Sequence, residues 1–159
     1  MDGPRGPSGM TLARITRNLF AGGALFAGLL ASSGAQMVSI KGGTVNMRAE
    51  PTLAGEVQYQ LGQGYPLKVV ERKGDWLRVV DFENDAGWVA KRFTSRTPHA
   101  IVKTPVANLR SGPGMNHRVV HRAEYGDVFR ILEKRKSWMR VQGDDDAIGW
   151  IARRLLWGS

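Results

Sequence analysis

The sequence predicts an all-β protein that consists of two tandem copies of one small barrel. The first observation is an internal repeat: residues 38–93 align with residues 100–155 without a gap, and 14 of the 56 aligned positions are identical. The second is a series of short β-branched and aromatic runs separated by turn residues. The third is the lack of any amphipathic helical pattern after residue 36. Strands of this length and spacing favour a small barrel or sandwich in each copy.

The chain of 159 residues begins with a segment that predicts export. Two arginines precede an apolar run, residues 19–31, and small residues follow it. This order is typical of a secretory signal peptide, so we expect residues 1–35 to be a helical signal peptide cleaved after Ala35, with Met10 as an alternative start. A buried helix or an uncleaved anchor are the alternatives. The run is short for a membrane span and no cysteine follows it, so we expect no permanent membrane or lipid anchor.

The rest of the chain divides into two copies with unequal charge. We expect a first domain over residues 36–94, a short linker over 95–99 and a second domain over 100–159, and so short a linker predicts that the copies touch. The whole chain carries a net charge of +9, and the half from residue 95 holds 12 of the basic residues against 6 acidic ones. Such a charge favours anionic partners: nucleic acid, a membrane surface or a cell-wall polymer.

Each copy starts with a strand that leads into a loop. The matching stretches are "VNMRAEP" (45–51) and "ANLRSGPG" (107–114), which share an asparagine, an apolar residue, an arginine and a proline. We expect the apolar residue, Met47 or Leu109, to face the core and the proline to fix a turn. The glycines of the second stretch are replaced in the first, which argues against a phosphate-binding loop because such a loop needs bare backbone amides.

The middle of each copy predicts a β-hairpin and a closing strand. Residues 76–80 and 138–142 alternate between apolar and polar side chains, the pattern of a half-buried strand. In the first copy a Gly-Asp pair precedes this strand, which is a hairpin signal. A polar turn and a Gly-Trp pair then start another short strand in both copies. The expected core residues are Val45, Met47, Val57, Leu61, Val69, Leu77, Val79 and Val89, with Ala107, Leu109, Val119, Ala123, Ile131, Met139, Val141 and Ile151 in the second copy.

These motifs resemble bacterial SH3 domains, whose usual opening is N-(V/L)-R-S-G-P and which continue with a W-x-x-V strand and a closing G-W-V segment. The resemblance extends over essentially the whole chain after residue 35, once in each copy. The first copy departs from the family pattern at Ala49, Glu50 and Thr52. It implies two tandem small SH3-like β-barrels of five or six strands each. It also implies an exported bacterial protein that binds peptidoglycan or peptides, often beside cell-wall hydrolases.

Tryptophan residues at matching positions are candidates for a ligand groove. Trp76 and Trp138 begin the alternating strand, so we expect them to be more exposed than Trp88 and Trp150 and able to stack on a peptide or glycan. The alternative is that they pack the barrel. The remaining repeated positions are expected to be structural: Pro51, Gly87, Trp88, Pro113, Gly149 and Trp150.

Arginine is the second candidate for ligand contact. Arg48 and Arg110 recur at the end of the first strand of each copy, and a guanidinium group can bind a carboxylate through two parallel hydrogen bonds. The alternative, which we favour, is that each arginine holds the following loop through backbone carbonyls. Tyr125 is a further groove candidate in the second copy.

The strongest basic cluster, Lys134, Arg135 and Lys136, is expected at a hairpin tip. A solvated turn is the simpler interpretation, and an anionic polymer is the ligand that the cluster would favour as a binding patch. The three adjacent aspartates, residues 144–146, lack the alternating ligands of a calcium loop, and we expect no metal and no cofactor.

No catalytic motif is present, so we expect a protein that is not an enzyme. The main hypothesis is an exported tandem binding module of the cell envelope or periplasm, with cell-wall polymer or an extracytoplasmic peptide or protein as its partner. An adaptor for one protein partner is the alternative. A nucleic-acid-binding β-barrel is a third hypothesis, against which the signal peptide argues.

Overall fold

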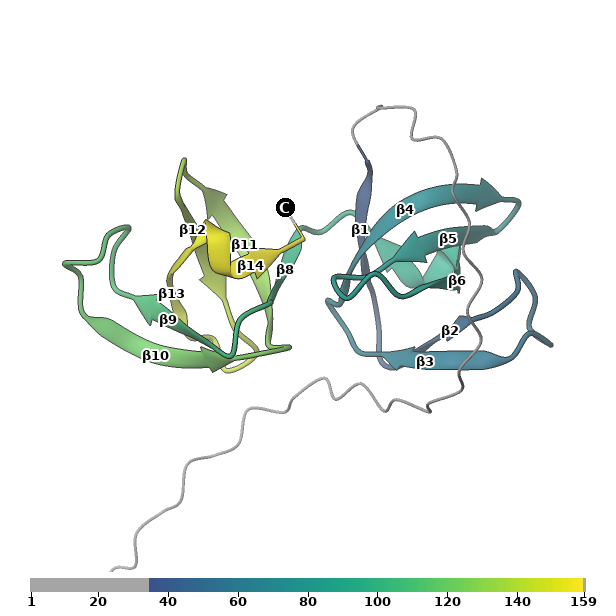
Figure 1. Ribbon diagram of the computed structural model, residues 1–159, viewed down its shortest axis with the longest axis horizontal. Helices are drawn as coiled ribbons and strands as arrows, with labels where there is room; N and C mark the ends of the chain where they lie inside the picture. Colours follow the sequence, from purple (N-terminus) through teal and green to yellow (C-terminus); the bar gives the residue numbers. More distant parts are fainter. Residues whose placement is uncertain (1–34, 159) are drawn as a thin grey trace, which may run out of the picture.

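The computed structural model describes residues 35–158 (Figure 1). These residues form two seven-stranded sheets, one in each copy, and contain no α-helix. The all-β prediction is therefore confirmed. The expected signal peptide lies outside the described residues, apart from Ala35 at its end. Within residues 35–158, no helix has the length and apolar character that crossing a membrane requires.

The two sheets have the same strand order. The first sheet consists of β1 (Met37–Ile40), β2 (Val45–Arg48), β3 (Val57–Leu61), β4 (Pro66–Lys73), β5 (Trp76–Val80), β6 (Ala86–Ala90) and β7 (Thr94–Ser95), with the 3-10 helix η1 (Lys91–Phe93) before β7. The second consists of β8 (His99–Val102), β9 (Val106–Arg110), β10 (Val119–Glu124), β11 (Val128–Lys134), β12 (Trp138–Gln142), β13 (Ile148–Ala152) and β14 (Leu156–Trp157), with η2 (Arg153–Leu155) before β14.

Every strand of the second copy has a counterpart at the same place in the first. The order β3-β2-β6-β5-β4-β1-β7 becomes β10-β9-β13-β12-β11-β8-β14, and all the pairs are antiparallel. The β4–β5 hairpin turns at Gly74, whose φ of 55° suits glycine. The repeat found in the sequence is thus a repeat of structure, and matching positions of the two copies can be compared directly.

The sheets curve around two hydrophobic cores, whose residues mostly agree with the prediction. Thirteen of the sixteen expected core residues are buried, while Val57 and Val69 are half-buried. The prediction was wrong for Val119, which is 41% exposed, because the pairing of β9 with β10 shifts register between Val119 and His121. The two largest fully buried side chains were not predicted: Tyr65 and Phe129 are each only 1% exposed.

The two copies touch, as the short linker predicts. The ring of Phe82, in the β5–β6 loop, lies 5.3 Å from the ring of Tyr125, between their centroids. The Tyr125 hydroxyl donates a 2.7 Å hydrogen bond to Oε1 of Glu83. From the second copy, Ile101 of β8 and Trp157 of β14 belong to or pack against the core of the first. The contact between the copies therefore includes apolar packing as well as a hydrogen bond.

A histidine at this contact predicts a dependence of stability on pH. His99 is half-buried against Gly64 of the first copy, where an added Cβ would lie 2.8 Å from its ring. Burial lowers the pKa of His99 below its ordinary value of 6.5, since the charged ring is poorly solvated there. The unfolded chain then binds the proton more readily than the folded one, so the contribution of His99 is fully present above pH 6.5 and is lost as the pH falls.

We therefore expect the free energy of unfolding to decrease on acidification from pH 7.5 to 5.5, and to decrease less in a His99→Gln variant. Chemical denaturation at a series of pH values measures both slopes. Equal slopes in the two proteins would contradict the assignment to His99. Other titrating groups are common to both proteins, so the difference between the slopes isolates this residue.

Candidate functional site

Each copy has a surface pocket at the same place in its fold. The pocket of the second copy has a volume of about 520 Å³ and is lined by Met115, Lys136, Ser137, Trp138, Ala152, Arg153 and Arg154. That of the first copy has a volume of about 590 Å³ and is lined by Leu53, Asp75, Trp76, Ala90, Lys91 and Arg92. The six residues of the first pocket occupy the positions of six of the seven residues of the second. Both volumes are in the range typical of ligand sites.

The tryptophan of each pocket is placed by strand alternation. Trp76 is the first residue of β5 and pairs with Ala90 at the end of β6, while Trp138 pairs with Ala152 in the same way. Leu77, the next residue of β5, points into the core, so Trp76 must point outward. Alanine is the partner in both copies, and Ala90 and Ala152 line the pockets beside the two tryptophans.

The basic residues of each pocket are held beside the tryptophan by the 3-10 helix. The backbone N–H of Lys91 donates a 2.8 Å hydrogen bond to the carbonyl of Asp75, and that of Arg153 donates a 2.9 Å bond to the carbonyl of Ser137. These bonds fix η1 and η2 against the residue that precedes each tryptophan. As a result, two consecutive cations of each helix are exposed at the rim of the pocket.

An apolar side chain from the β2–β3 loop completes the first pocket, and one from the β9–β10 loop completes the second. Leu53 and Met115 occupy matching positions, and each is 67% exposed. A single exposed apolar residue on a surface is ordinary. Two such residues at matching positions, each beside a half-buried indole and two cations, indicate a surface for an amphipathic ligand.

Arg48 and Arg110 position these loops and line neither pocket. Nη1 of Arg48 donates to the carbonyl of Gly55 at 2.7 Å. Nη1 of Arg110 donates to the carbonyls of Met115 at 3.1 Å and His117 at 2.8 Å. The geometry agrees with the loop-holding alternative for both arginines. Through these bonds, Arg110 sets the position of Met115.

Replacing Arg110 by alanine is expected to lower the free energy of unfolding by about 1–2 kcal/mol, because two hydrogen bonds from a charged group are lost, an exposed one to the Met115 carbonyl and a half-buried one to the His117 carbonyl. Chemical denaturation measures the loss. Arg118→Ala is the matched control: Arg118 belongs to the same loop, is exposed, and among the described residues makes no side-chain hydrogen bond or ion pair. Equal effects of the two substitutions would contradict the loop-holding role.

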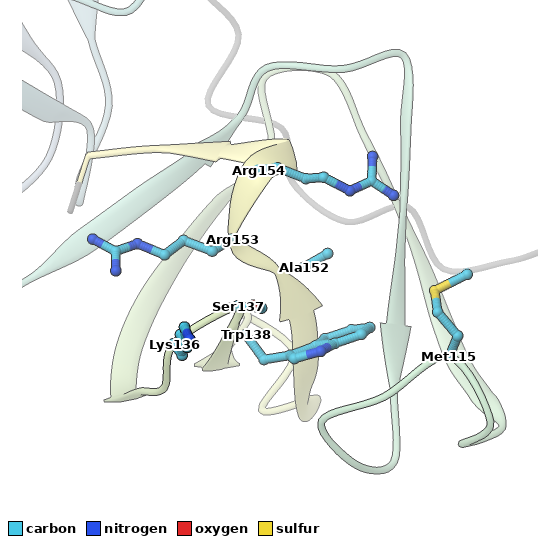
Figure 2. Close-up of a pocket in the computed structure, with 7 residues that line it drawn as sticks. All are labelled: Met115, Lys136, Ser137, Trp138, Ala152, Arg153 and Arg154. Carbon is cyan, nitrogen blue, oxygen red and sulfur yellow. The ribbon is translucent and has the colours of Figure 1, made fainter.

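Figure 2 shows how the side chains of the second pocket lie. The indole of Trp138 forms its floor, Arg154 extends from η2 above the indole, and Met115 stands at the right of the view. Lys136 and Arg153 lie at the left. The pocket therefore offers an aromatic face and an apolar edge at one end, with cations above the ring and at the other end.

The remaining sequence candidates lie outside the pockets, except for Lys136. Lys134 ends β11, and Arg135 sits in the hairpin turn with its Cζ 4.8 Å from the ring centroid of Trp150 and its Nε 2.7 Å from Glu133. Tyr125 packs against the first copy, as described above, and is therefore not part of either pocket.

The Gly-Trp pairs and the prolines occupy structural positions. Trp150 is only 8% exposed, while Trp88 is half-buried; Trp88 pairs with Arg48 at the end of β2, and Trp150 pairs with Arg110 at the end of β9. A Cβ added at Gly149 would come within 2.6 Å of Leu109 Cγ, and one at Gly87 within 2.6 Å of Met47 Cγ. Pro51 and Pro113 lie half-buried in the loops that Arg48 and Arg110 hold.

Sequence reasoning missed several pocket residues. Arg92 and Arg154 are the same residue type at matching positions of the repeat, and so are Ala90 and Ala152. That identity was a usable signal, but nothing in a linear pattern shows that these residues fold back beside Trp76 and Trp138. Leu53 and Met115 gave a weaker signal, since both are apolar residues in a loop.

Three carboxylates of the first copy gather in the β5–β6 turn, where the sequence had suggested no site. Ligand atoms of Asp81, Glu83 and Asp85 all lie within 4.8 Å of one another. Asp81 is buried, and its carboxylate accepts hydrogen bonds from the N–H groups of Glu83 and Asp85 and from the hydroxyl of Tyr65. Desolvation raises the pKa of Asp81, although these hydrogen bonds act in the opposite direction. The cluster is thus the framework of a tight turn.

The comparisons with known proteins agree with the repeat. Residues 41–95 and 103–158 each match the family model described as "Bacterial SH3 domain". The chain is also 22% identical over 123 residues to "Putative N-acetylmuramoyl-L-alanine amidase YrvJ" of Bacillus subtilis (strain 168). That match covers 70% of this chain but only 24% of the Bacillus protein.

Solved structures of similar chains include NlpC2 and NlpC1 from Trichomonas vaginalis. They are 15% and 19% identical, with TM-scores of 0.36 and 0.35, and the matches cover 79% and 86% of this chain and 48% and 51% of theirs. An NlpC/P60 family protein from Bacillus cereus ATCC 10987 is 15% identical with a TM-score of 0.35, over 76% of this chain and 55% of its own. The chain thus spans about half the length of these solved chains.

Proposed function

The chain belongs to the bacterial SH3 domain family, and from this we propose that it is an exported, non-enzymatic tandem binding module of the cell envelope. We propose peptidoglycan as its ligand. The observation that carries the proposal is the pair of matched pockets, each of which combines a half-buried indole, an exposed apolar loop residue and two consecutive cations.

The chemistry of these pockets suits a wall polymer. An indole face stacks on the apolar faces of sugars and peptides, and the cations attract the carboxylates that cell-wall stem peptides carry. Residues 36–159 carry 20 basic and 13 acidic residues, and this net charge of +7 favours association with a negatively charged polymer in the same way. The similarity to a protein named as a putative N-acetylmuramoyl-L-alanine amidase supports this ligand class, while the amidase activity belongs to that protein.

Two copies on one chain add a further advantage for a polymeric ligand. A repeating polymer can occupy both pockets at once, and the second binding event is then intramolecular. Contacts such as that between Phe82 and Tyr125 hold the copies against each other, which reduces the ordering cost of binding at two sites.

Co-sedimentation of the purified protein with isolated sacculi at low salt tests the proposal. We expect the protein to pellet with the sacculi and to remain in the supernatant without them. A protein that stays in solution at every sacculus concentration would contradict peptidoglycan binding. Affinity capture from an envelope extract then tests the alternative function, an adaptor for one protein partner. An adaptor would enrich one protein from the extract and would not bind isolated sacculi.

A further inference from the structure

The two pockets differ in charge at the hairpin tip, although the rest of their linings match. In the first copy the tip residues before the tryptophan are Gly74 and Asp75, and in the second they are Lys136 and Ser137. The lining of the first pocket therefore carries two cations and one carboxylate, whereas that of the second carries three cations and no carboxylate. The second copy is also the more basic half of the chain.

The arginine of the 3-10 helix differs between the copies as well. In the first copy the guanidinium carbon of Arg92 lies 4.7 Å from the ring centroid of Phe93, a cation–π contact. Leu155 takes the place of Phe93 in the second copy, so Arg154 has no such ring beside it. Among the described residues the Arg154 side chain makes no hydrogen bond or ion pair, and in Figure 2 it extends from η2 toward the side of the pocket where Met115 lies.

We propose that the second pocket is the carboxylate-binding site of the protein. Arg154 binds the anionic group, Lys136 and Arg153 add positive charge at the other end of the pocket, and Trp138 and Met115 contact the apolar part of the same ligand. The first pocket binds carboxylates weakly because Asp75 repels them. This inference rests on the proposed function, and it names the part of the wall polymer that is recognised: the free carboxylates of the stem peptides.

Charge and shape favour this occupant. A guanidinium group presents its N–H donors in a planar fork that matches the two oxygens of a carboxylate. Asp75 and Ser137 bond to their 3-10 helices through backbone carbonyls, which accept from Lys91 and Arg153, and within residues 35–158 their side chains make no hydrogen bond to those helices. Their side chains are therefore available to set the charge of each pocket without changing how it is built.

This last point allows a matched exchange between the copies. Ser137→Asp gives the second pocket the carboxylate of the first, and Asp75→Ser gives the first pocket the hydroxyl of the second. The probe is isolated sacculi, either untreated or with their free carboxyl groups converted to amides by a carbodiimide and ammonia. Gln63→Glu is the control for net charge, since Gln63 is exposed and lines neither pocket.

On untreated sacculi we expect Ser137→Asp to weaken binding by about fivefold and Asp75→Ser to strengthen it by about twofold, as one charge at a solvated rim allows. We expect Gln63→Glu to have little effect. Amidation of the sacculi should weaken binding of the unmodified protein by a similar or larger factor. It should also abolish most of the difference between the unmodified protein and Ser137→Asp.

The outcomes separate the two proposals. Equal binding to untreated and amidated sacculi would overturn carboxylate recognition and leave peptidoglycan binding in place. Loss of binding only after phosphate-containing wall polymers are removed would also overturn it, because the recognised anion would then be a phosphate. If neither kind of sacculus binds the protein, both the proposed function and this inference fail.

Discussion

Replacing Trp76 and Trp138 together by alanine is expected to lower the affinity for isolated sacculi by about a hundredfold or more. The two indoles are the largest side chains in the pockets, and truncating an aromatic anchor in a binding site commonly costs about 2 kcal/mol or more. Both residues are half-buried on the outer side of their strands, so the free protein does not depend on them for its cores. Binding isotherms from co-sedimentation measure the loss.

The control for this experiment is the double phenylalanine variant, which keeps an aromatic face in each pocket and should retain most of the binding. Circular dichroism establishes that both variants are folded. A folded double alanine variant with unchanged affinity would place the ligand elsewhere on the molecule. Loss of binding in the phenylalanine variant as well would indicate that the indole N–H, and not stacking, dominates.

The largest effect on stability is expected from Gly149→Ala. An added Cβ would lie 2.6 Å from Leu109 Cγ and 2.8 Å from the carbonyl oxygen of Arg110, closer than these atoms can pack. Leu109 is completely buried, so its side chain cannot move toward solvent to relieve the clash. We expect a loss of about 2–3 kcal/mol in the free energy of unfolding, as overpacking in a core produces. Chemical denaturation monitored by tryptophan fluorescence gives the value.

Two other glycines serve as references for this prediction. Gly43→Ala should change stability by less than about 0.5 kcal/mol, because a Cβ there meets nothing within 4 Å. Gly87→Ala should cost less than Gly149→Ala, since the Cγ of Met47 belongs to a more adaptable side chain than that of Leu109. Equal stability of the Gly149→Ala and Gly43→Ala variants would show that the Gly-Trp segment packs less closely than described.

The sequence predicted the fold well because its signals are local and appear twice. Alternation along residues 76–80 and 138–142 gave the correct inner and outer faces, as Leu77 and Val79 are buried. Val119 was placed wrongly because a register shift at a bulge cannot be inferred from alternation. Tyr65 was missed as a core residue because it lies in a turn, where no periodicity indicates burial.

The candidate site was only partly predictable, since it is assembled from three separate segments. Trp76 and Trp138 were found from strand alternation, whereas Arg154 was not, because its position depends on how η2 folds back onto the hairpin. The sequence left two roles open for Arg110, and the hydrogen bonds to Met115 and His117 favour the loop-holding one. Tyr125 contacts Phe82 of the other copy, and that contact depends on how the copies dock.

The central claim is that both copies bind wall material at Trp76 and Trp138. The most direct measurement follows the indole N–H signals of the five tryptophans by NMR while soluble fragments of glycosidase-digested sacculi are added. We predict that the signals of Trp76 and Trp138 shift on addition, while those of Trp88, Trp150 and Trp157 stay nearly constant. If all five signals stay in place, or if only the other three move, the account of the two pockets is wrong.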